Sequence, residues 1–181
     1  IDNNRKRCSV KILQTTNHKP QTTNVTIAIS LIKNASRFEW FLEKATEIGV
    51  TEIIPLVCER TEKTAFKFQR MKSILVSAML QSQQCWLPVL HDPTKFNQLV
   101  VSATHQQKFI AHCIEGEKRN LSDMNNESLT YKTILIGPEG DFTEKEIEIA
   151  TQHGFIPVSL GKNRLRTETA GLVAVALLGV S

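Results

Sequence analysis

Residues 134–150 read ILIGPEGDFTEKEIEIA, and residues 160–178 read LGKNRLRTETAGLVAVALL. Both stretches open on the end of an apolar, strand-like run that stops at a glycine, Gly137 in the first and Gly161 in the second. Ligands of open α/β sheets bind beyond the carboxyl ends of the strands, where glycine lets backbone amides come close to a ligand. Two such loops predict one pocket with two walls. One loop alone would favour a simple turn at Gly137 and Gly140.

A helix is predicted directly after the first loop. Thr143 and Glu146 have the spacing of a capping box, in which each side chain satisfies the backbone N–H of the other residue. Phe142 and Ile147 have the spacing of a hydrophobic staple, and Gly154 is placed to end the helix. The loop before the helix matches neither GxxxxGK[ST] nor GxGxxG, so a nucleoside triphosphate or a dinucleotide is disfavoured as its ligand.

Strand and helix patterns also alternate upstream of this stretch. Ser36 and Glu39 predict a capping box that opens a helix, and Gly49 is placed to end it. The further expected strands are 25–31, 52–58, 108–114, 132–136 and 155–160, and the further expected helices are 68–84, 95–103 and 168–178. Residues 115–130 are polar and are expected to form a loop. This alternation predicts the α/β class with a mainly parallel sheet.

The composition is typical of a globular domain rather than of a membrane, metal or disulfide protein. The 181 residues carry a net charge of +4, which is compatible with an acidic partner such as RNA. The four cysteines form no CxxC pair and have no metal-ligand partners at zinc spacing, so we expect reduced thiols in a cytoplasmic protein and no metal. The longest apolar run, 170–178, is too short to span a bilayer, so no membrane partner is expected.

The last predicted helix, 168–178, is apolar all round, so it must be buried on every side. A subunit interface would bury it, and so would a central position in the core of a monomer. The residues alone give these two interpretations comparable weight.

Four segments resemble the RsmE family of ribosomal RNA uridine-N3 methyltransferases, within the SPOUT superfamily. They are the two quoted stretches, the segment FEWFLEKATEIGVTEIIPLVCERT at 38–61 and the helix end QSQQ at 81–84. The resemblance runs in matching order from about Val25 to Gly179. It implies a SPOUT-type sheet with helices on both faces and a deep C-terminal trefoil knot from about Tyr131 onward. It also implies S-adenosyl-L-methionine as the cofactor and 16S ribosomal RNA as the substrate. A homodimer packed through the last helix is implied as well, which favours the interface interpretation of 168–178.

In this family a β-barrel RNA-binding domain of the PUA-like type precedes the catalytic domain. Residues 1–24 are polar, contain one strand-like run, Cys8 to Leu13, and cannot form a core alone. We expect residues 1–24 to be the C-terminal remnant of such a barrel plus a linker, and residues 25–181 to be the SPOUT methyltransferase domain. Since the chain starts at Ile1, it is interpreted as a fragment.

The two loops and the resemblance together assign roles to individual residues. Residues that should bind the cofactor, mainly through their backbone, are Leu135, Ile136, Gly137, Pro138, Gly140, Leu160, Gly161, Leu165, Arg166 and Thr169, with His112 and Cys113 at a strand end as an adenine-side wall. An ordinary surface position is the alternative for His112. One departure from the family is Asp141, where members often carry a second glycine. Because Thr143 still caps the helix, the pocket should survive, and the cofactor contacts near Gly140 are the part affected.

Methyl transfer to uridine N3 requires that the N3 proton leaves and that the resulting negative charge is stabilised. Arg166 is the first candidate for a fixed cation beside that charge, and an ion pair to Glu168 or Glu139 is its alternative role. Glu139 is the second catalytic candidate, as a base, although a carboxylate at a helix-entry loop is as often structural.

RNA phosphates are expected to contact Arg37, Lys44 and Arg60, of which the first two lie on nearly the same helical face. The alternative is a solvated charged face. Two rival functions remain: a SPOUT methyltransferase acting on transfer RNA or another nucleoside, and a non-catalytic RNA-binding or dimerisation module. The resemblance over 38–61 argues against the first rival, and the intact cofactor loops argue against the second.

Overall fold

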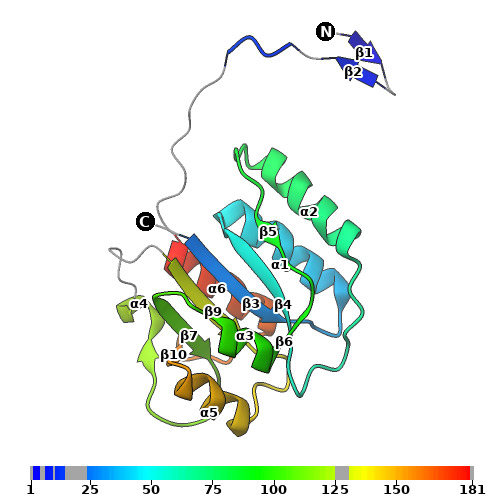
Figure 1. The fold of residues 1–181 in the computed structure, drawn as a ribbon. Coiled ribbons are helices and arrows are strands. Elements are labelled where there is room, and N and C mark those ends of the chain that lie inside the picture. Colours follow the sequence, from blue (N-terminus) through cyan, green and yellow to red (C-terminus); the bar gives the residue numbers. More distant parts are fainter. Residues whose placement is uncertain (1, 5–6, 10, 15–23, 125–130, 180–181) are drawn as a thin grey trace.

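A computed structural model describes residues 2–4, 7–9, 11–14, 24–124 and 131–179. Its main sheet has the strand order β5-β4-β3-β9-β7-β10-β8, with β6 also paired to β4, and all of these pairings are parallel. The strands are β3 (Asn24–Ser30), β4 (Glu52–Val57), β5 (Val89–Leu90), β6 (Thr94–Lys95), β7 (Gln107–Ala111), β8 (Arg119–Asn120), β9 (Tyr131–Ile136) and β10 (Ile156–Ser159). The predicted α/β class with a mainly parallel sheet is confirmed (Figure 1).

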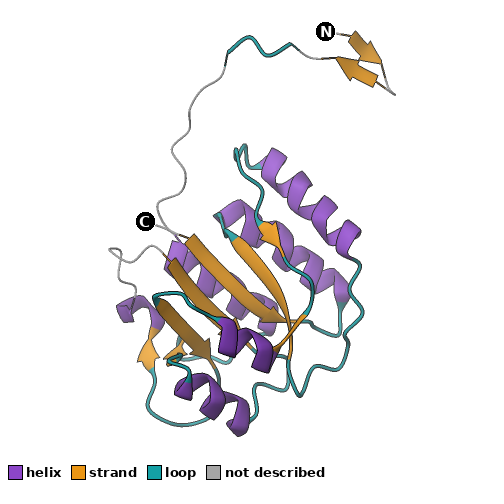
Figure 2. Cartoon of the chain, in the orientation of Figure 1, coloured by secondary structure: helices purple, strands orange, loops and turns teal. Residues whose placement is uncertain are grey.

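Helices cover both faces of this sheet (Figure 2). They are α1 (Ala35–Ile48), α2 (Phe68–Gln81), α3 (Phe96–Ser102), α4 (Leu121–Met124), α5 (Glu144–Gln152) and α6 (Thr167–Gly179). α1 packs against α2 and α6 on one face, and α3 packs against α5 on the other. Because side chains alternate along a strand, Ile27 and Ile29 of β3 join the first core with Phe41, whereas Ala28 joins the second core with Phe142.

Two of the predicted helix signals are confirmed and one is wrong. Gly49 ends α1 at φ 101, and the Thr143–Glu146 capping box opens α5, with the Thr143 N–H donating to Glu146 Oε2 at 2.9 Å. Ser36, however, is not the N-cap of α1. Asn34 is, since its backbone is extended and its side chain accepts a hydrogen bond from the Ser36 N–H at 3.0 Å. Glu39 is therefore free to pair with Arg70 of α2, at 2.8 Å from Nη2 to Oε2.

Several predicted boundaries also differ from the structure. α2 ends at Gln81 instead of 84, because Gln83 adopts a left-handed backbone with φ 58. The polar segment predicted as a loop at 115–130 contains β8 and the short helix α4, whose Leu121 is fully buried, while 125–130 lie outside the described residues. The strand expected at Cys8 to Leu13 is replaced by an antiparallel pair, β1 (Asp2–Asn4) and β2 (Arg7–Ser9), in a separate two-stranded sheet.

The single chain buries only one face of the last helix, so the alternative of a central position in the core of a monomer is wrong, and the interface interpretation stays a prediction. One face of α6 is buried through Gly171, Ala174, Val175 and Leu178, whereas Leu172 and Leu177 are only half-buried. Gly171 allows a close approach to the core, since a Cβ there would lie 2.7 Å from Phe41 Cε2. In the part of the chain that the structure describes, no helix is long and apolar enough to cross a membrane.

Candidate cofactor pocket and active site

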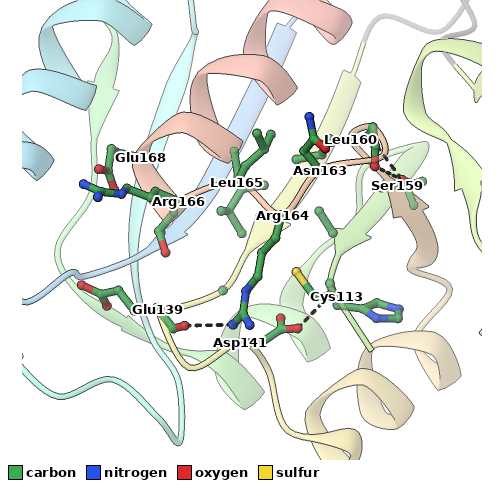
Figure 3. A pocket seen from close by; sticks show the side chains of 18 of the residues that line it. Cys113, Glu139, Asp141, Ser159, Leu160, Asn163, Arg164, Leu165, Arg166 and Glu168 are labelled. Atoms are coloured by element: carbon green, nitrogen blue, oxygen red, sulfur yellow. Dashed lines mark hydrogen bonds between the residues drawn. The ribbon is translucent and has the colours of Figure 1, made fainter. Parts of the chain in front are cut away.

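Three neighbouring strands end side by side at one edge of the sheet. Ile136, the last residue of β9, is in register with Ala111 of β7, and Ala111 is in register with Val158 of β10. The segments that follow these strands therefore start at the same level. Between them lies a pocket of about 650 Å³, which is within the usual range of small-molecule sites (Figure 3).

Most of the predicted cofactor-binding residues line this pocket. They are Ile136, Gly137, Pro138, Leu160, Gly161, Leu165, Arg166 and His112, and Glu139 lies on the same wall. Leu135, Gly140 and Thr169 do not line it. Leu135 points into the core on the other face of the sheet, because it alternates with Ile136 along β9. Gly140 is covered by Arg60, whose Nη1 donates a hydrogen bond to the Gly140 carbonyl at 2.7 Å.

Gly137 serves the turn as well as the pocket. A Cβ at this position would lie 3.1 Å from Phe142 Cδ2 and 3.2 Å from the Phe142 backbone nitrogen. The chain folds back on itself here and buries Phe142 completely against Phe96, at a ring-centroid distance of 5.5 Å. The turn interpretation and the pocket interpretation of this glycine are thus compatible, since the tight turn exposes the loop's backbone to the pocket.

His112 brings two polar atoms without partners to the pocket wall. Both ring nitrogens are buried, and neither makes a hydrogen bond of normal geometry with a described residue, although the Ile114 backbone lies near enough to favour the protonated ring slightly. Burial, followed by the positive charge of Lys118, lowers the pKa of His112, and the neighbouring Asp141 only partly opposes this. The imidazole is therefore neutral at pH 7, with one donor and one acceptor to offer. Buried polar atoms without partners are uncommon in folded proteins, so this side chain fits a wall that binds a polar ligand.

Asp141 joins two of the segments that form the pocket. Its backbone has φ 63, a left-handed conformation that glycine adopts more easily. One carboxylate oxygen accepts a hydrogen bond from the Cys113 N–H at 2.7 Å, and the other accepts one from the Phe142 N–H at 2.8 Å. Asp141 thus holds the segment after β7 against the segment after β9, and the expectation that the pocket survives this departure from the family agrees with the geometry.

The charged groups of the pocket are arranged differently from the predicted pairs (Figure 3). Glu168, which is 7% exposed, pairs with Arg37 at 3.7 Å from Nε to Oε1. Glu139 accepts a hydrogen bond from the Lys33 N–H at 3.1 Å, and its carbonyl accepts one from Arg164 Nη2 at 3.4 Å. Within the described ranges Arg166 makes no ion pair, so its alternative role as a partner of Glu168 or Glu139 is not realised.

The three cations expected to contact RNA are not brought together. Lys44 is engaged by its own helix, with Nζ 2.8 Å from Glu43 Oε1 and 2.9 Å from Glu47 Oε1. Arg60 lies over Gly140, while Arg37 lines the pocket. Arg37 and Lys44, predicted to share one helical face, therefore have different surroundings. Arg37 lines the pocket, and Lys44 forms ion pairs within its own helix.

The pocket also contains residues that the sequence did not mark as cofactor-binding: Ala111, Lys118, Asp141, Val158, Ser159, Lys162, Asn163, Arg164, Thr167, Glu168 and Ala170. Cys113, expected beside His112 on the adenine-side wall, lines the pocket as well. Two signals would have found part of this set. Lys162 and Arg164 stand in the same charged run as Arg166. The residues after β7 follow a strand end, the signal that pointed to His112, but the same reasoning did not reach Lys118 because that segment contains no glycine until Gly116.

Comparisons with known proteins agree with this geometry. Residues 18–179 match a family described as an RNA methyltransferase domain. Ribosomal RNA small subunit methyltransferase E of Synechocystis is 36% identical over 157 residues, which cover 84% of this chain and 52% of that protein. Thus the chain spans about half the length of this curated relative.

Solved structures give the same result. A probable rRNA methyltransferase from Porphyromonas gingivalis is 39% identical, with a TM-score of 0.81 over 89% of this chain and 68% of that one. The ribosomal RNA small subunit methyltransferase E of Neisseria gonorrhoeae, crystallised with S-adenosyl methionine, is 32% identical, with a TM-score of 0.77 over 85% of this chain and 64% of that one. Fold, pocket and matches define an α/β RNA methyltransferase domain. The chain belongs to the ribosomal RNA small subunit methyltransferase E (RsmE) family, which confirms the resemblance seen in the sequence.

Proposed function

We propose that this chain uses S-adenosyl-L-methionine to methylate N3 of a uridine in 16S ribosomal RNA. The observation that carries the proposal is the pocket between the segments after β7, β9 and β10, with the unpartnered ring nitrogens of His112 on its wall. The cofactor bound to the Neisseria relative supports the choice of ligand. When bound, S-adenosylmethionine supplies an electrophilic methyl group.

The residues present fit this cofactor. Gly137, Pro138 and Gly161 line the pocket, and the backbone of such loops suits the edges of adenine and the hydroxyls of ribose. The neutral imidazole of His112 adds a donor and an acceptor on the wall formed after β7. Leu165 contributes apolar surface to the opposite wall.

The chemistry assigned to the chain is the stabilisation of a deprotonated uracil. A uridine held at the pocket passes its N3 proton to a base, so negative charge develops on the ring, and the nitrogen then takes the methyl group as the bond between that methyl group and sulfur breaks. Arg166 is the proposed cation beside that charge, because its guanidinium lines the pocket and forms no ion pair among the described residues. A preorganised cation in such a place contributes about 3 kcal/mol as an order of magnitude. Glu139 is the second candidate, as the base, although its Oε1 already accepts the Lys33 N–H.

The proposed assembly follows the family. Half-buried apolar residues on α6, among them Leu172 and Leu177, offer a surface for the same helix of a second copy. A deep trefoil knot is proposed from about Tyr131 onward: β9 inserts between β3 and β7, and the chain returns from β10 as α6 against α1. Residues 1–24 are proposed as the remnant of a PUA-like barrel and its linker, and 25–181 as the methyltransferase domain, acting in the cytoplasm.

Calorimetric titration with S-adenosylmethionine, followed by methylation of 16S ribosomal RNA, tests the proposed function. We expect binding by the folded protein, and we expect mass mapping to place the new methyl group on a uridine. Arg166→Ala should bind the cofactor nearly normally and methylate about 100-fold more slowly, which corresponds to loss of a transition-state contact. A folded dimer that binds no S-adenosylmethionine would refute the methyltransferase proposal, and methylation of transfer RNA alone would favour the rival SPOUT enzyme.

A further inference from the structure

Positive charge exceeds negative charge around the pocket. Five cationic side chains line it, Arg37, Lys118, Lys162, Arg164 and Arg166, against three carboxylates, Glu139, Asp141 and Glu168. S-adenosylmethionine carries a sulfonium and an ammonium but only one carboxylate, so it does not call for extra cations. The excess therefore matches a second, anionic ligand.

Not all of these cations are equally free to bind that ligand. Arg37 is paired with Glu168. Lys118 donates to two backbone carbonyls of its own segment, those of His112 at 3.1 Å and Ile114 at 2.8 Å, so it holds the pocket wall in shape. Among the described residues, the other pocket cations are Lys162, Arg164 and Arg166, in the segment between β10 and α6.

Lys162, Arg164 and Arg166 are all exposed in that segment, and Arg166 is already assigned to the target base, which leaves Lys162 and Arg164. Neither has a carboxylate partner among the described residues. Arg164 reaches across the pocket to the Glu139 carbonyl, but the hydrogen bond is single and 3.4 Å long (Figure 3). A guanidinium has five N–H donors, so most of those of Arg164 remain for another acceptor.

We propose that Lys162 and Arg164 bind the phosphates of a single-stranded RNA segment beside the target nucleotide. This proposal rests on the proposed function. Arg166, the residue assigned to the target base, is two residues from Arg164, and two residues of extended chain span at most about 7 Å. That reach is comparable to the length of one nucleotide. Phosphate contacts of this kind position RNA without reading its sequence.

The assignment moves the RNA contact away from the face predicted at first. Lys44 is neutralised by Glu43 and Glu47, whereas Lys162 and Arg164 line the pocket and form no ion pair with any residue that the structure describes. A cation already paired with carboxylates releases fewer counterions when RNA binds. Lys44 is therefore expected to contribute little to RNA affinity.

Salt-dependent RNA binding tests the proposal. The probe is a fluorescein-labelled oligouridine of about 12 nucleotides, a length within the usual range of single-strand sites. Each lost phosphate contact lowers the slope of log K against log salt by about 0.7 for single strands, so Lys162→Ala/Arg164→Ala should lower it by about 1.4 and weaken binding about 25-fold at about 0.1 M salt. Lys72→Ala, which removes an exposed charge from α2, is the matched control and should leave both values unchanged. Lys162→Ala/Arg164→Lys should bind the oligouridine more tightly than Lys162→Ala/Arg164→Ala, since lysine keeps the charge at position 164.

Calorimetry with S-adenosylmethionine separates this proposal from the proposed function. Normal cofactor binding by the double variant, together with weakened RNA binding, supports the proposal. Unchanged RNA affinity, or a cofactor affinity reduced as much as the RNA affinity, overturns it, because the two cations would then hold the cofactor or nothing. If the unmodified chain binds the cofactor but no oligouridine, the phosphate proposal alone fails. If it binds neither, the proposed function fails first.

Discussion

Asp141 Oδ2 accepts a hydrogen bond from the Cys113 N–H at 2.7 Å, so a residue that follows β9 fixes the segment that follows β7. The backbone at this position has φ 63, in the left-handed region that glycine adopts most easily. A non-glycine residue in this conformation is uncommon, although Asp and Asn are among those that tolerate it. The backbone at Asp141 is therefore strained, but its side chain links the two pocket walls through hydrogen bonds.

Replacing Asp141 should separate backbone strain from this tether. Asp141→Gly relieves the strain but loses two charge-assisted hydrogen bonds, to the Cys113 and Phe142 N–H groups. The bond to Cys113 joins the two pocket walls, and its loss, about 1.5 kcal/mol, should weaken S-adenosylmethionine binding by about 10-fold. The variant's midpoint of urea unfolding should change little, because the two effects oppose each other. Asp141→Asn keeps a side-chain oxygen that can accept the Cys113 N–H. Its affinity for S-adenosylmethionine should therefore lie between those of the parent and of Asp141→Gly. Calorimetry and urea titration measure both quantities, and a glycine variant that binds as tightly as the parent would show that the tether does not shape the pocket.

Thiol labelling should report the occupancy of the pocket. Cys113 is exposed and lines it, Cys85 is exposed elsewhere, and Cys58 is buried. Burial, aided by the negative charge of Glu146, raises the pKa of Cys58 well above its usual range, and only the thiolate reacts readily. Iodoacetamide at about pH 8 should modify Cys85 and Cys113 and spare Cys58. Saturating S-adenosylmethionine should slow only Cys113, as peptide mass mapping would reveal.

The control for this experiment lies within the same chain. Cys85 should react equally fast with and without the cofactor, because it does not line the pocket. If calorimetry shows binding but the rate at Cys113 stays constant, the cofactor does not occupy this wall.

Local signals in the sequence predicted much of this fold, and long-range contacts explain the failures. The Thr143–Glu146 box and the Gly49 C-cap depend on atoms a few residues apart, and both were predicted correctly. The α1 start was misplaced because two good cap residues, Asn34 and Ser36, compete within three positions. The choice also frees Glu39 to pair with Arg70, which is distant in sequence.

In the candidate site, too, local signals were visible in the sequence and long-range contacts were not. The two glycine loops were recognised because strand ends followed by glycine are visible in the sequence. Which cations reach the pocket was not visible: Arg37 pairs with Glu168 across α1 and α6, and Lys44 turns to its own helix. Equal spacing on a helix says which face a side chain shares, but not which carboxylate lies nearest to it.

The neutral state of His112 should appear in the pH dependence of stability. Its pKa is lowered in the folded chain, so the unfolded chain binds a proton first as the pH falls. The resulting loss of stability begins near the ordinary imidazole pKa of about 6.5 and stops growing below the lowered pKa of the folded state. Above that window His112 is neutral in both states and contributes no pH dependence.

Comparison of the parent with His112→Asn isolates this effect from the other histidines. The free energy of unfolding, measured by urea titration at about pH 8 and about pH 5.5, should fall more on acidification in the parent than in the variant. An equal fall in both proteins would mean that His112 titrates alike in the folded and unfolded chains.

The contact of α6 with the core should make Gly171→Ala destabilising, although alanine favours helix. The new Cβ would lie 2.7 Å from Phe41 Cε2 and 2.8 Å from Ile29 Cδ1, both on buried side chains. Overpacking of this kind costs about 1–3 kcal/mol, and the gain in helix propensity returns about 1 kcal/mol. A net loss of up to about 2 kcal/mol in the free energy of unfolding is expected from urea titration.

Gly179→Ala is the matched control, because among the described residues a Cβ there meets Val25 Cγ2 alone, at an ordinary 3.6 Å. It should be neutral or slightly stabilising. The Gly171 variant should also bind S-adenosylmethionine more weakly, since α1 and α6 bring Arg37 and Glu168 together at the pocket wall and a displaced α6 would part them. Equal stability of the two alanine variants would mean that α6 moves away from Phe41 at little cost, and the close packing of this helix would not be what holds the pocket in shape.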